Sequence, residues 1–349
     1  MRVKASILGH FGEGENLLNG QTIKTKTITE ELQSQIGREQ VLKIDTHGGL
    51  KTFLKAPFQV FRALKNSNNI LIFPAHNGLR VFAPLLSFQK RFFKKRKIHY
   101  IVIGGWLPKF LLKRKNLAKT LKNFDYIYVE TYTMKDALET QGFDNVYVMP
   151  NCKKLTILSE KEIVDHLESP YKLCTFSRVM KEKGIETAVS VIKQVNDKLG
   201  YTACSLDIYG QVDVAQTEWF ENLKFQFPEY VNYCGCVDAN QSVTVLKEYF
   251  ALLFPTYYEG EGFAGTLIDA YSAGVPVIAS DWKYNSELVN EDVGYVYPTE
   301  DQEAFVSILE EIVMNPYMIL SKKRLCLKEA EKYKIDKVIQ ILVQHMEDK

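Results

Sequence analysis

The sequence lacks the long apolar runs of a membrane-spanning protein. Of its 349 residues, 46% are hydrophobic and 25% are charged, which are ordinary values for a globular protein. No apolar run approaches the roughly 20 residues that a helix needs to cross a bilayer. The first eight residues lead directly into a glycine loop and lack the apolar core of a signal peptide. We therefore expect them to form the first strand of a domain in a cytoplasmic protein.

Cysteine is scarce, and its spacing does not suggest a metal site. The six cysteines are scattered, and only Cys234 and Cys236 are close in sequence. Zinc sites usually show CxxC pairs or regular Cys/His spacings, and neither is present. The cysteines are therefore predicted to be reduced thiols, and no metal ligand is expected.

The dinucleotide fingerprint GxGxxG is also absent. Gly9, Gly12 and Gly14 punctuate the first loop but have the wrong spacing for it. A nicotinamide cofactor is therefore not expected, and no other motif indicates a bound cofactor. Internal repeats and low-complexity tracts are absent as well.

Short apolar runs that alternate with helical stretches predict an α/β fold with parallel, doubly wound sheets. A length of 349 residues is long for one core and comfortable for two. The predicted strands of the first half are residues 6–9, 41–45, 69–73, 99–103, 126–130 and 146–149. Residues 150–170 contain no clear strand and are interpreted as the linker. Ligands of such sheets collect at the carboxyl ends of the strands.

The segment from Phe254 to Glu287 carries the strongest pattern. An apolar run ends in a loop that holds Glu259, Glu261 and three glycines, and a short helix and a buried strand follow. Glycines let a ligand approach the backbone, and the first amides of a helix suit a phosphate. Glu261 and Asp269 more plausibly accept hydrogen bonds from neutral hydroxyls, such as those of a sugar. The alternative is a tight turn followed by a helix whose Asp269 is merely solvated.

This segment resembles the signature of the retaining family 4 (group 1) glycosyltransferases of the bacterial surface-polysaccharide type. Glu261–Phe263 and Ala273–Val277 match the family pattern, although Asp269 stands where glutamate is usual and Ala264 where glycine is usual. The resemblance implies the GT-B fold, in which two Rossmann-like domains face each other across a cleft. It places the acceptor-side domain at residues 1–165 and the donor-binding domain at 170–334. A final helix over 335–349 is expected to return to the first domain.

The resemblance also assigns roles in binding a nucleotide-diphosphate-sugar, with UDP-sugars favoured. Arg178 and Lys183 match the family cations that bind the donor pyrophosphate, and Glu261 matches the carboxylate that holds sugar hydroxyls. Two convergent cations at a strand-to-helix turn suit one anion; the alternative is a pair of surface cations that cap a helix. The remaining donor-binding candidates are Gly12, Gly14, Gly20, Cys236, Val237, Gly262, Phe263, Ala264, Gly265, Thr266 and Asp269.

Two further residues follow predicted strands of the first domain. His76 lies in the loop after residues 69–73, and Trp106 lies after residues 99–103. Both are candidates for contact with the acceptor or the sugar. A lone loop histidine is otherwise often structural.

The net charge of +2 conceals an asymmetry between the two halves. Residues 1–165 hold 27 Lys and Arg against 14 Asp and Glu, a net charge of +13, whereas the remainder holds 17 against 28, a net charge of −11. The run from Lys90 to Lys122 contains twelve bases, no acid and several large apolar residues. This pattern favours an anionic membrane surface. A solvated basic face remains the alternative, and nucleic acid is disfavoured.

Together these features predict a retaining, metal-independent hexosyltransferase at the inner face of the membrane. It would move a sugar from a nucleotide-diphosphate-sugar to a glycan or lipid-linked glycan during surface-polysaccharide synthesis. Two alternatives remain open. One is a nucleotide-sugar epimerase of the same architecture, and the other is a non-catalytic nucleotide-sugar-binding protein.

Overall fold

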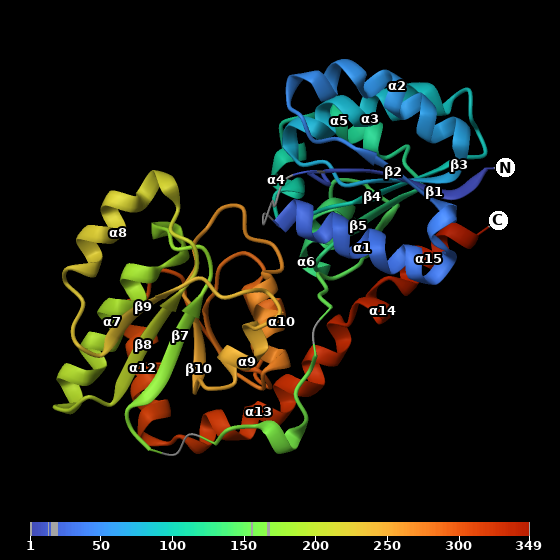
Figure 1. Ribbon diagram of the computed structural model, residues 1–349. Coiled ribbons are helices and arrows are strands. Elements are labelled where there is room, and N and C mark those ends of the chain that lie inside the picture. Colours follow the sequence, from blue (N-terminus) through green and yellow to red (C-terminus); the bar gives the residue numbers. More distant parts are fainter. Residues whose placement is uncertain (1, 13, 15–19, 155, 166–167, 349) are drawn as a thin grey trace. The chain divides into compact units, whose positions relative to one another are not determined.

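The computed structural model describes residues 2–12, 14, 20–154, 156–165 and 168–348. The chain forms two compact units, Met1–Lys154 with Ile335–Lys349, and Leu155–Lys334. Each unit contains its own six-stranded sheet (Figure 1).

The sheet of the first unit has the strand order β2-β1-β3-β4-β5-β6, and all its neighbouring strands are parallel. Its strands are β1 (Val3–Gly9), β2 (Val41–Asp45), β3 (Ser67–Ile72), β4 (Lys97–Ile101), β5 (Tyr126–Val129) and β6 (Val146–Val148). Its helices are α1 (Gly20–Ile36), α2 (Leu50–Asn66), α3 (His76–Lys90), α4 (Leu107–Leu112), α5 (Lys115–Leu121), α6 (Tyr132–Glu139), α14 (Ile335–Val338) and α15 (Gln340–Glu347), with a 3-10 turn η1 (Arg38–Gln40).

Helices cover both faces of this first sheet. Figure 1 shows α2, α3 and α5 on one face, with α1 and α15 on the other. The central strands are therefore apolar where helices cover both faces, as at the buried residues 70–72. Ile335, Val338, Ile339 and Leu342 pack with Ile28 and Leu32 of α1 into one core. The predicted C-terminal apolar stripe thus lies in this core, although the helix is interrupted at Ile339.

The second unit has the strand order β12-β11-β10-β7-β8-β9, again with parallel neighbours. Its strands are β7 (Tyr171–Phe176), β8 (Cys204–Tyr209), β9 (Val231–Gly235), β10 (Ala251–Phe254), β11 (Val277–Ser280) and β12 (Gly294–Tyr297). Its helices are α7 (Ile185–Leu199), α8 (Thr217–Lys224), α9 (Ser242–Leu246), α10 (Gly265–Ser272), α11 (Asn285–Leu288), α12 (Gln302–Met314) and α13 (Tyr317–Ala330), with 3-10 turns η2 (Glu160–Glu162), η3 (Lys181–Lys183), η4 (Val214–Gln216) and η5 (Glu331–Tyr333).

Two apolar clusters cover the two faces of the second sheet. One joins β7 and β8 to α7, α8 and α12, and the other joins β10 and β11 to α9, α10 and α13. The predicted α/β class with two doubly wound, Rossmann-like parallel sheets is confirmed.

Among the described residues, no single helix is long and apolar enough to cross a membrane. Residues 302–314 and 317–333 pass a test of length and composition only when taken together, and they are bent by 98° at their junction. Both contribute side chains to the cores of the second unit, among them Phe305, Leu309 and Cys326.

Candidate functional site

The predicted donor-binding residues of the second unit follow three strands of one parallel sheet. Arg178 and Lys183 follow β7, Cys236 and Val237 follow β9, and Glu261 follows β10. β7 lies between β10 and β8, and β9 is the next strand. Because parallel strands end at the same edge of a sheet, these segments gather at its carboxyl edge, where ligands of such folds bind.

Lys183 and Glu261 form an ion pair, although 78 residues separate them. Lys183 Nζ lies 2.5 Å from Glu261 Oε2, and their side chains are only 12% and 8% exposed. The same Oε2 accepts a hydrogen bond of 2.9 Å from the buried Thr256 hydroxyl. The sequence assigned separate roles to the cation and the carboxylate, and the structure joins them in one buried cluster.

Gly184 allows η3 to approach the loop after β10. It has a φ of +70°, and a Cβ atom there would lie 2.1 Å from the Pro255 carbonyl oxygen. The Glu182 carbonyl accepts a hydrogen bond of 2.8 Å from the Tyr257 amide. Lys183 Nζ then lies over the rings of Phe254 and Tyr258, at 5.6 and 5.1 Å. A side chain at position 184 would therefore push Lys183 away from Glu261.

Arg178 lies on a loop that backbone contacts hold in place, but its own side chain is exposed. Val179 bridges to Val212, and a Cβ atom on Gly210 would lie 1.8 Å from the Ser177 carbonyl oxygen. The guanidinium is more than half exposed and pairs with Asp213 at 3.5 Å. An exposed pair of this kind contributes at most about 1 kcal/mol, so the guanidinium can turn to another anion at little cost.

The loop 262–264 leads into α10 without a side-chain cap. Ala264 is extended at the N-cap and makes no side-chain hydrogen bond. Phe263 is buried, with its ring 4.7 Å from that of Tyr333, and anchors the loop. The first amides of α10, at Gly265 and Thr266, carry the positive end of the helix dipole, which favours an anion.

Two polar groups on α10 lie close to this helix start. The hydroxyl oxygen of Thr266 is buried and has no hydrogen-bond partner. Asp269 follows one turn later and is 3% exposed. Residues three and four apart share a helix face, so Asp269 lies on the same face of α10 as Gly265 and Thr266, one turn further along the helix. An unpartnered buried hydroxyl is costly unless something satisfies it, which fits a polar ligand at this position.

Cys236 and Val237 follow β9 at the edge of the sheet. Gly235 before them has a φ of +73°, and its carbonyl accepts a hydrogen bond of 2.8 Å from the Gly210 amide. Cys236 is exposed and Val237 is half-buried. The assignment of this turn to nucleobase binding stays a prediction.

In the first unit, the loop after β1 carries the predicted glycines. Gly12 and Gly14 have φ values of +59° and +89°, which disfavour any side chain. Gly20 begins α1. Residues 13 and 15–19 lie outside the described residues. The assignment of these glycines to donor binding stays a prediction.

His76 and Trp106 come together after β3 and β4. Their ring centroids are 3.9 Å apart, and Phe110 of α4 packs against both rings, at 5.0 and 5.1 Å. The Trp106 indole nitrogen donates a hydrogen bond of 2.8 Å to the Ile103 carbonyl. Partial burial and then the charge of Arg114 lower the pKa of His76. A neutral imidazole beside an indole offers a polar edge and a flat apolar face to a ligand.

A second histidine pair was not predicted. His10 Nε2 lies 2.8 Å from His47 Nδ1, and His10 Nδ1 lies 2.8 Å from the Thr22 hydroxyl. Asp45 Oδ1 accepts hydrogen bonds from the amides of Phe11 and His47, at 3.0 and 2.8 Å. The signal was available in the sequence, because His10 directly follows the predicted strand 6–9 and His47 comes two residues after the predicted strand 41–45.

The structure divides the basic run Lys90–Lys122 into surface and core. Residues 97–101 form β4, and Leu107, Leu111, Leu117 and Leu121 are buried. Arg96 is also buried, and its Nε donates a hydrogen bond of 3.0 Å to the Leu64 carbonyl. The leucines at these four positions are therefore core residues, and only part of the run is a surface.

Among the residues that the structure describes, no group of three or more His, Cys, Asp or Glu side chains could hold a metal ion. All six cysteines are free thiols. Cys234 and Cys236 are exposed and the other four are buried.

Comparison with known proteins agrees with the resemblance seen in the sequence. The chain is 25% identical over 217 residues to the GtfA subunit of a UDP-N-acetylglucosamine–peptide N-acetylglucosaminyltransferase from Streptococcus pneumoniae, which covers 60% of this chain and 41% of that protein. The chain therefore spans about two fifths of the length of the curated relatives it matches first.

Solved structures are similar over nearly the whole chain. A sucrose-phosphate synthase from Thermosynechococcus elongatus matches with a TM-score of 0.76 and 16% identity, over 98% of both chains. Alr3699/HepE from Anabaena, in complex with UDP and glucose, matches with a TM-score of 0.71 and 15% identity, over 97% and 98% of the two chains. The family model of the glycosyl transferases group 1 matches residues 158–333, half of the chain. The protein belongs to this family, the family 4 glycosyltransferases, and has the GT-B fold.

Proposed function

We propose that the protein is a retaining glycosyltransferase that moves a sugar from a nucleotide-diphosphate-sugar to a hydroxyl of a glycan or lipid-linked glycan. The observation that carries the proposal is the buried Lys183–Glu261–Thr256 cluster at the carboxyl edge of the second sheet. The cation and the uncapped start of α10 suit the diphosphate of such a donor, and the carboxylate suits its sugar hydroxyls.

The cluster can serve both halves of such a donor. A lysine ammonium has three donors, and Lys183 directs one of them to Glu261. The other two are available to diphosphate oxygens. Glu261 uses Oε2 for Lys183 and Thr256, which leaves Oε1 for a sugar hydroxyl. Lys183 would thus connect the diphosphate to the carboxylate that binds the sugar.

Charge grows on the departing diphosphate as the bond to the sugar breaks. Fixed donors aimed at that charge stabilise the transition state in a site that excludes water. We assign this role to Lys183, to Arg178 and to the first amides of α10, with the Thr266 hydroxyl beside them. These groups would supply the positive charge without a metal ion. Retention follows from the family assignment, and the leaving phosphate could then serve as the base for the acceptor hydroxyl.

UDP-sugars are the proposed donors. The S. pneumoniae relative is named for UDP-N-acetylglucosamine, and the Anabaena structure contains UDP and glucose. Surface polysaccharide is the proposed product. An outer-core galactosyltransferase of lipopolysaccharide, WaaB, has the same fold, with a TM-score of 0.71 over 99% of both chains.

We also propose that the exposed part of Lys90–Lys122 contacts an anionic membrane. Phe92, Lys94 and Lys95 are exposed beyond the end of α3. Each base near an anionic surface contributes on the order of 1 kcal/mol. The variant K94S/K95S should bind anionic vesicles less tightly than the wild type, and both should ignore neutral vesicles. If the wild type floats equally well with neutral and with anionic vesicles, the proposed contact with an anionic membrane is wrong.

Calorimetric titration of UDP tests the donor site. Lys183→Met alone leaves Glu261 buried without its cation, so the variant K183M/E261Q is the better test. It should bind UDP at least tenfold more weakly than the wild type. Lys181→Met is the matched control, because Lys181 lies two positions away on η3 and directs its ammonium toward Trp219, at 5.8 Å. If K183M/E261Q binds UDP as tightly as the wild type does, the assignment of Lys183 to the diphosphate is wrong.

A further inference from the structure

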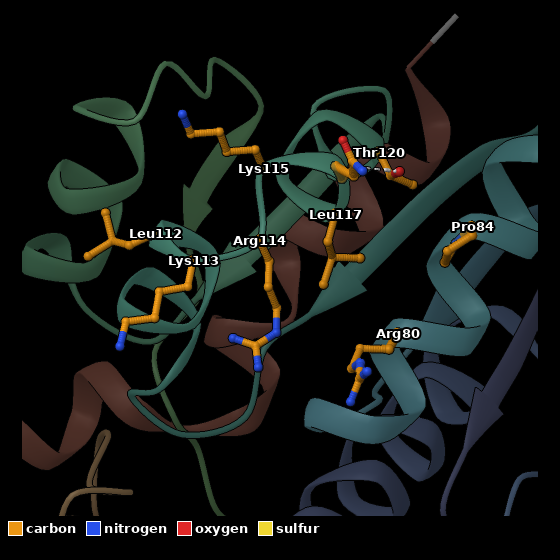
Figure 2. Close-up of a pocket in the computed structure, with 9 residues that line it drawn as sticks. Arg80, Pro84, Leu112, Lys113, Arg114, Lys115, Leu117 and Thr120 are labelled. Carbon is orange, nitrogen blue, oxygen red and sulfur yellow. Dashed lines mark hydrogen bonds between the residues drawn. The ribbon is translucent and has the colours of Figure 1, made fainter.

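A basic pocket of about 760 Å³ lies in the first unit, between α3 and the turn from α4 to α5. It is lined by Arg80, Pro84, Leu112, Lys113, Arg114, Lys115, Asn116, Leu117 and Thr120 (Figure 2). Seven of these residues lie in the basic run Lys90–Lys122, whereas Arg80 and Pro84 lie outside it. The proposed donor chemistry uses none of the nine.

The pocket holds four cations without a carboxylate. Among the described residues, none of Arg80, Lys113, Arg114 and Lys115 forms an ion pair with an acid. The sequence explains this, because no Asp or Glu occurs between Asp45 and Asp125, a stretch that contains 17 Lys and Arg residues. Four like charges around one hollow repel one another, and a bound anion would relieve that repulsion.

Arg114 is held in position and not merely solvated. Its Nη1 donates a hydrogen bond of 3.1 Å to the Phe110 carbonyl, and its Cζ lies 3.8 Å from the centre of the Phe110 ring. Figure 2 shows its side chain pointing to the side of the pocket where Arg80 lies, whereas Lys115 points to the opposite side. A planar guanidinium fixed by stacking suits phosphate oxygens, which it can bind with two hydrogen bonds.

Phe110 connects Arg114 of the pocket to the His76–Trp106 pair. Phe110, on which Arg114 stacks, packs against both rings. Arg114 also lies close enough to His76 to lower its pKa, after partial burial. A ligand with its phosphate at Arg114 would therefore place the next group of the same molecule near the indole and imidazole, which suit a sugar ring.

One face of α3 connects these groups to an apolar surface. His76, Arg80, Pro84 and Phe88 are spaced four residues apart and share a helix face. At 1.5 Å per residue, this face extends about 18 Å from His76 to Phe88. Phe88 is 58% exposed and Phe92, just beyond the helix, is 75% exposed. Along α3 the order is therefore a ring pair, cations, and then exposed phenylalanines.

Helix α2 extends this apolar surface. Leu54, Phe58 and Phe61 are exposed on α2. Phe61 packs against Phe93 with ring centroids 5.8 Å apart, and the Gln89 side chain donates a hydrogen bond of 3.1 Å to the Pro57 carbonyl. An apolar patch fringed by bases and free of acids fits a lipid, whereas a phosphate in water would need no such patch.

We propose that this pocket binds the phosphate or diphosphate of a lipid-linked acceptor. Arg80 and Arg114 hold the phosphate oxygens, the lipid lies along Phe88 and Phe92, and the sugar that accepts the transfer lies toward His76 and Trp106. The inference rests on the proposed function, because it names the acceptor of that reaction, but its binding site lies outside the donor cluster.

Calorimetry with three soluble probes tests the proposal, with UDP present in excess to occupy the donor site. The probes are geranyl diphosphate, inorganic pyrophosphate and geraniol. Geranyl diphosphate should bind the wild type at least tenfold more tightly than either of the other two. It should bind R80Q/R114Q at least tenfold more weakly than the wild type. K172Q/K193Q, which removes two exposed cations of the second unit, should match the wild type.

The variant F88S/F92S separates the lipid from the phosphate. It should bind geranyl diphosphate about as weakly as pyrophosphate, with pyrophosphate binding unchanged. Equal affinity of the wild type for geranyl diphosphate and pyrophosphate would overturn the lipid part, and unchanged binding by R80Q/R114Q would overturn the pocket.

UDP binding, measured in the same preparations, separates this proposal from the proposed function. R80Q/R114Q should bind UDP as the wild type does, which also shows that it is folded. If the wild type does not bind UDP, the result counts against the donor site. If it binds UDP but not geranyl diphosphate, the result counts against the acceptor pocket alone. In the wild type, geranyl diphosphate that competes with UDP would also overturn the proposal, because it would then occupy the donor site.

Discussion

Glu261 and Asp269 lie eight residues apart, yet their surroundings differ. Both side chains are buried, but Glu261 lies in the loop after β10, where it pairs with Lys183, whereas Asp269 lies on the second turn of α10. The two carboxylates therefore face different parts of a ligand and should not be interchangeable.

Binding of UDP and of a UDP-sugar should separate the two carboxylates. Glu261→Gln keeps the shape and one acceptor oxygen, so it should weaken binding of a UDP-sugar by about tenfold while UDP binding changes little. Asp269→Ala should weaken both if Asp269 holds the ribose. Calorimetry with UDP and with UDP-glucose measures the difference. Equal losses in the two variants would contradict this division of roles.

The buried Lys323 should affect how the stability of the protein depends on pH. Its side chain is buried on α13, its Nζ donates a long hydrogen bond of 3.4 Å to the Tyr249 carbonyl, and burial lowers its pKa from 10.5 to about 8. Between about pH 8 and 10 the Lys323 side chain therefore binds more protons in the unfolded chain than in the folded one, so its own contribution to the free energy of unfolding should rise with pH.

Lys323→Met should remove this rise and stabilise the protein at pH 7 by about 3 kcal/mol, since one pKa unit corresponds to about 1.4 kcal/mol. Urea unfolding at pH 7, 8, 9 and 10 measures it. The same pH slope in the variant and the wild type would show that Lys323 is not the responsible group. The buried cysteines, whose pKa is raised by burial, contribute with the opposite sign in this range, and the buried tyrosines do so above pH 10. The difference between the variant and the wild type therefore isolates Lys323.

At the scale of elements, the turn η3 and the loop after β10 form one structure. Gly184 closes it, because only glycine tolerates both the φ of +70° and the approach of the Pro255 carbonyl. The Lys183–Glu261 pair depends on this contact.

Gly184→Ala should therefore lower UDP binding by at least tenfold and cost about 3 kcal/mol of stability, because both strain and displacement follow. Gly200→Ala is the matched control. Gly200 also has a positive φ, +75° at the end of α7, but a Cβ atom there would meet nothing within 4 Å. The UDP affinity of Gly200→Ala should equal that of the wild type. Similar UDP affinities in the two variants would refute the role given to Gly184.

Most strands could be predicted from apolar runs, because both sheets are covered on two faces. The prediction for residues 41–45 matches β2. β12 was missed because this edge strand has only four residues, and Tyr295 and Val296 within it are half-buried. The basic run Lys90–Lys122 was interpreted as one surface, but Leu107, Leu111, Leu117 and Leu121 belong to the core, whereas Leu112 is exposed. Contact of this run with a membrane stays a prediction.

The candidate site could be predicted only as separate motifs. Glycines and charged residues around β7 and β10 marked Arg178, Lys183 and Glu261, but the pairing of Lys183 with Glu261 depends on strand order, which the sequence does not state. The Arg80–Arg114 pocket was missed for the same reason. Its cations come from α3 and from the α4–α5 turn, and no local spacing connects them.

At the scale of the whole molecule, the last helices belong to the first unit although they follow the second in sequence. Leu342 of α15 is fully buried in the core that contains Ile28 and Leu32. The stability of the first unit therefore depends on the end of the chain.

Leu342→Ala should destabilise the first unit by about 3 kcal/mol. Hydrogen exchange should become faster in peptides from residues 20–154, and peptides from 171–330 should change little. Leu309→Ala, in the core of the second unit, should give the mirror pattern. Faster exchange across the whole chain in both variants would show that the two units unfold together.

The central claim is that the chain is a retaining glycosyltransferase whose donor is held by Lys183 and Glu261. NMR of the sugar anomer released or transferred from an α-linked UDP-sugar tests it most directly, with K183M/E261Q and K181M assayed in parallel. The account predicts that the α-anomer forms first, at similar rates in the wild type and K181M, and at least 100-fold more slowly in K183M/E261Q. A β-anomer as the first product, an epimerised UDP-sugar, or undiminished turnover in K183M/E261Q would contradict it.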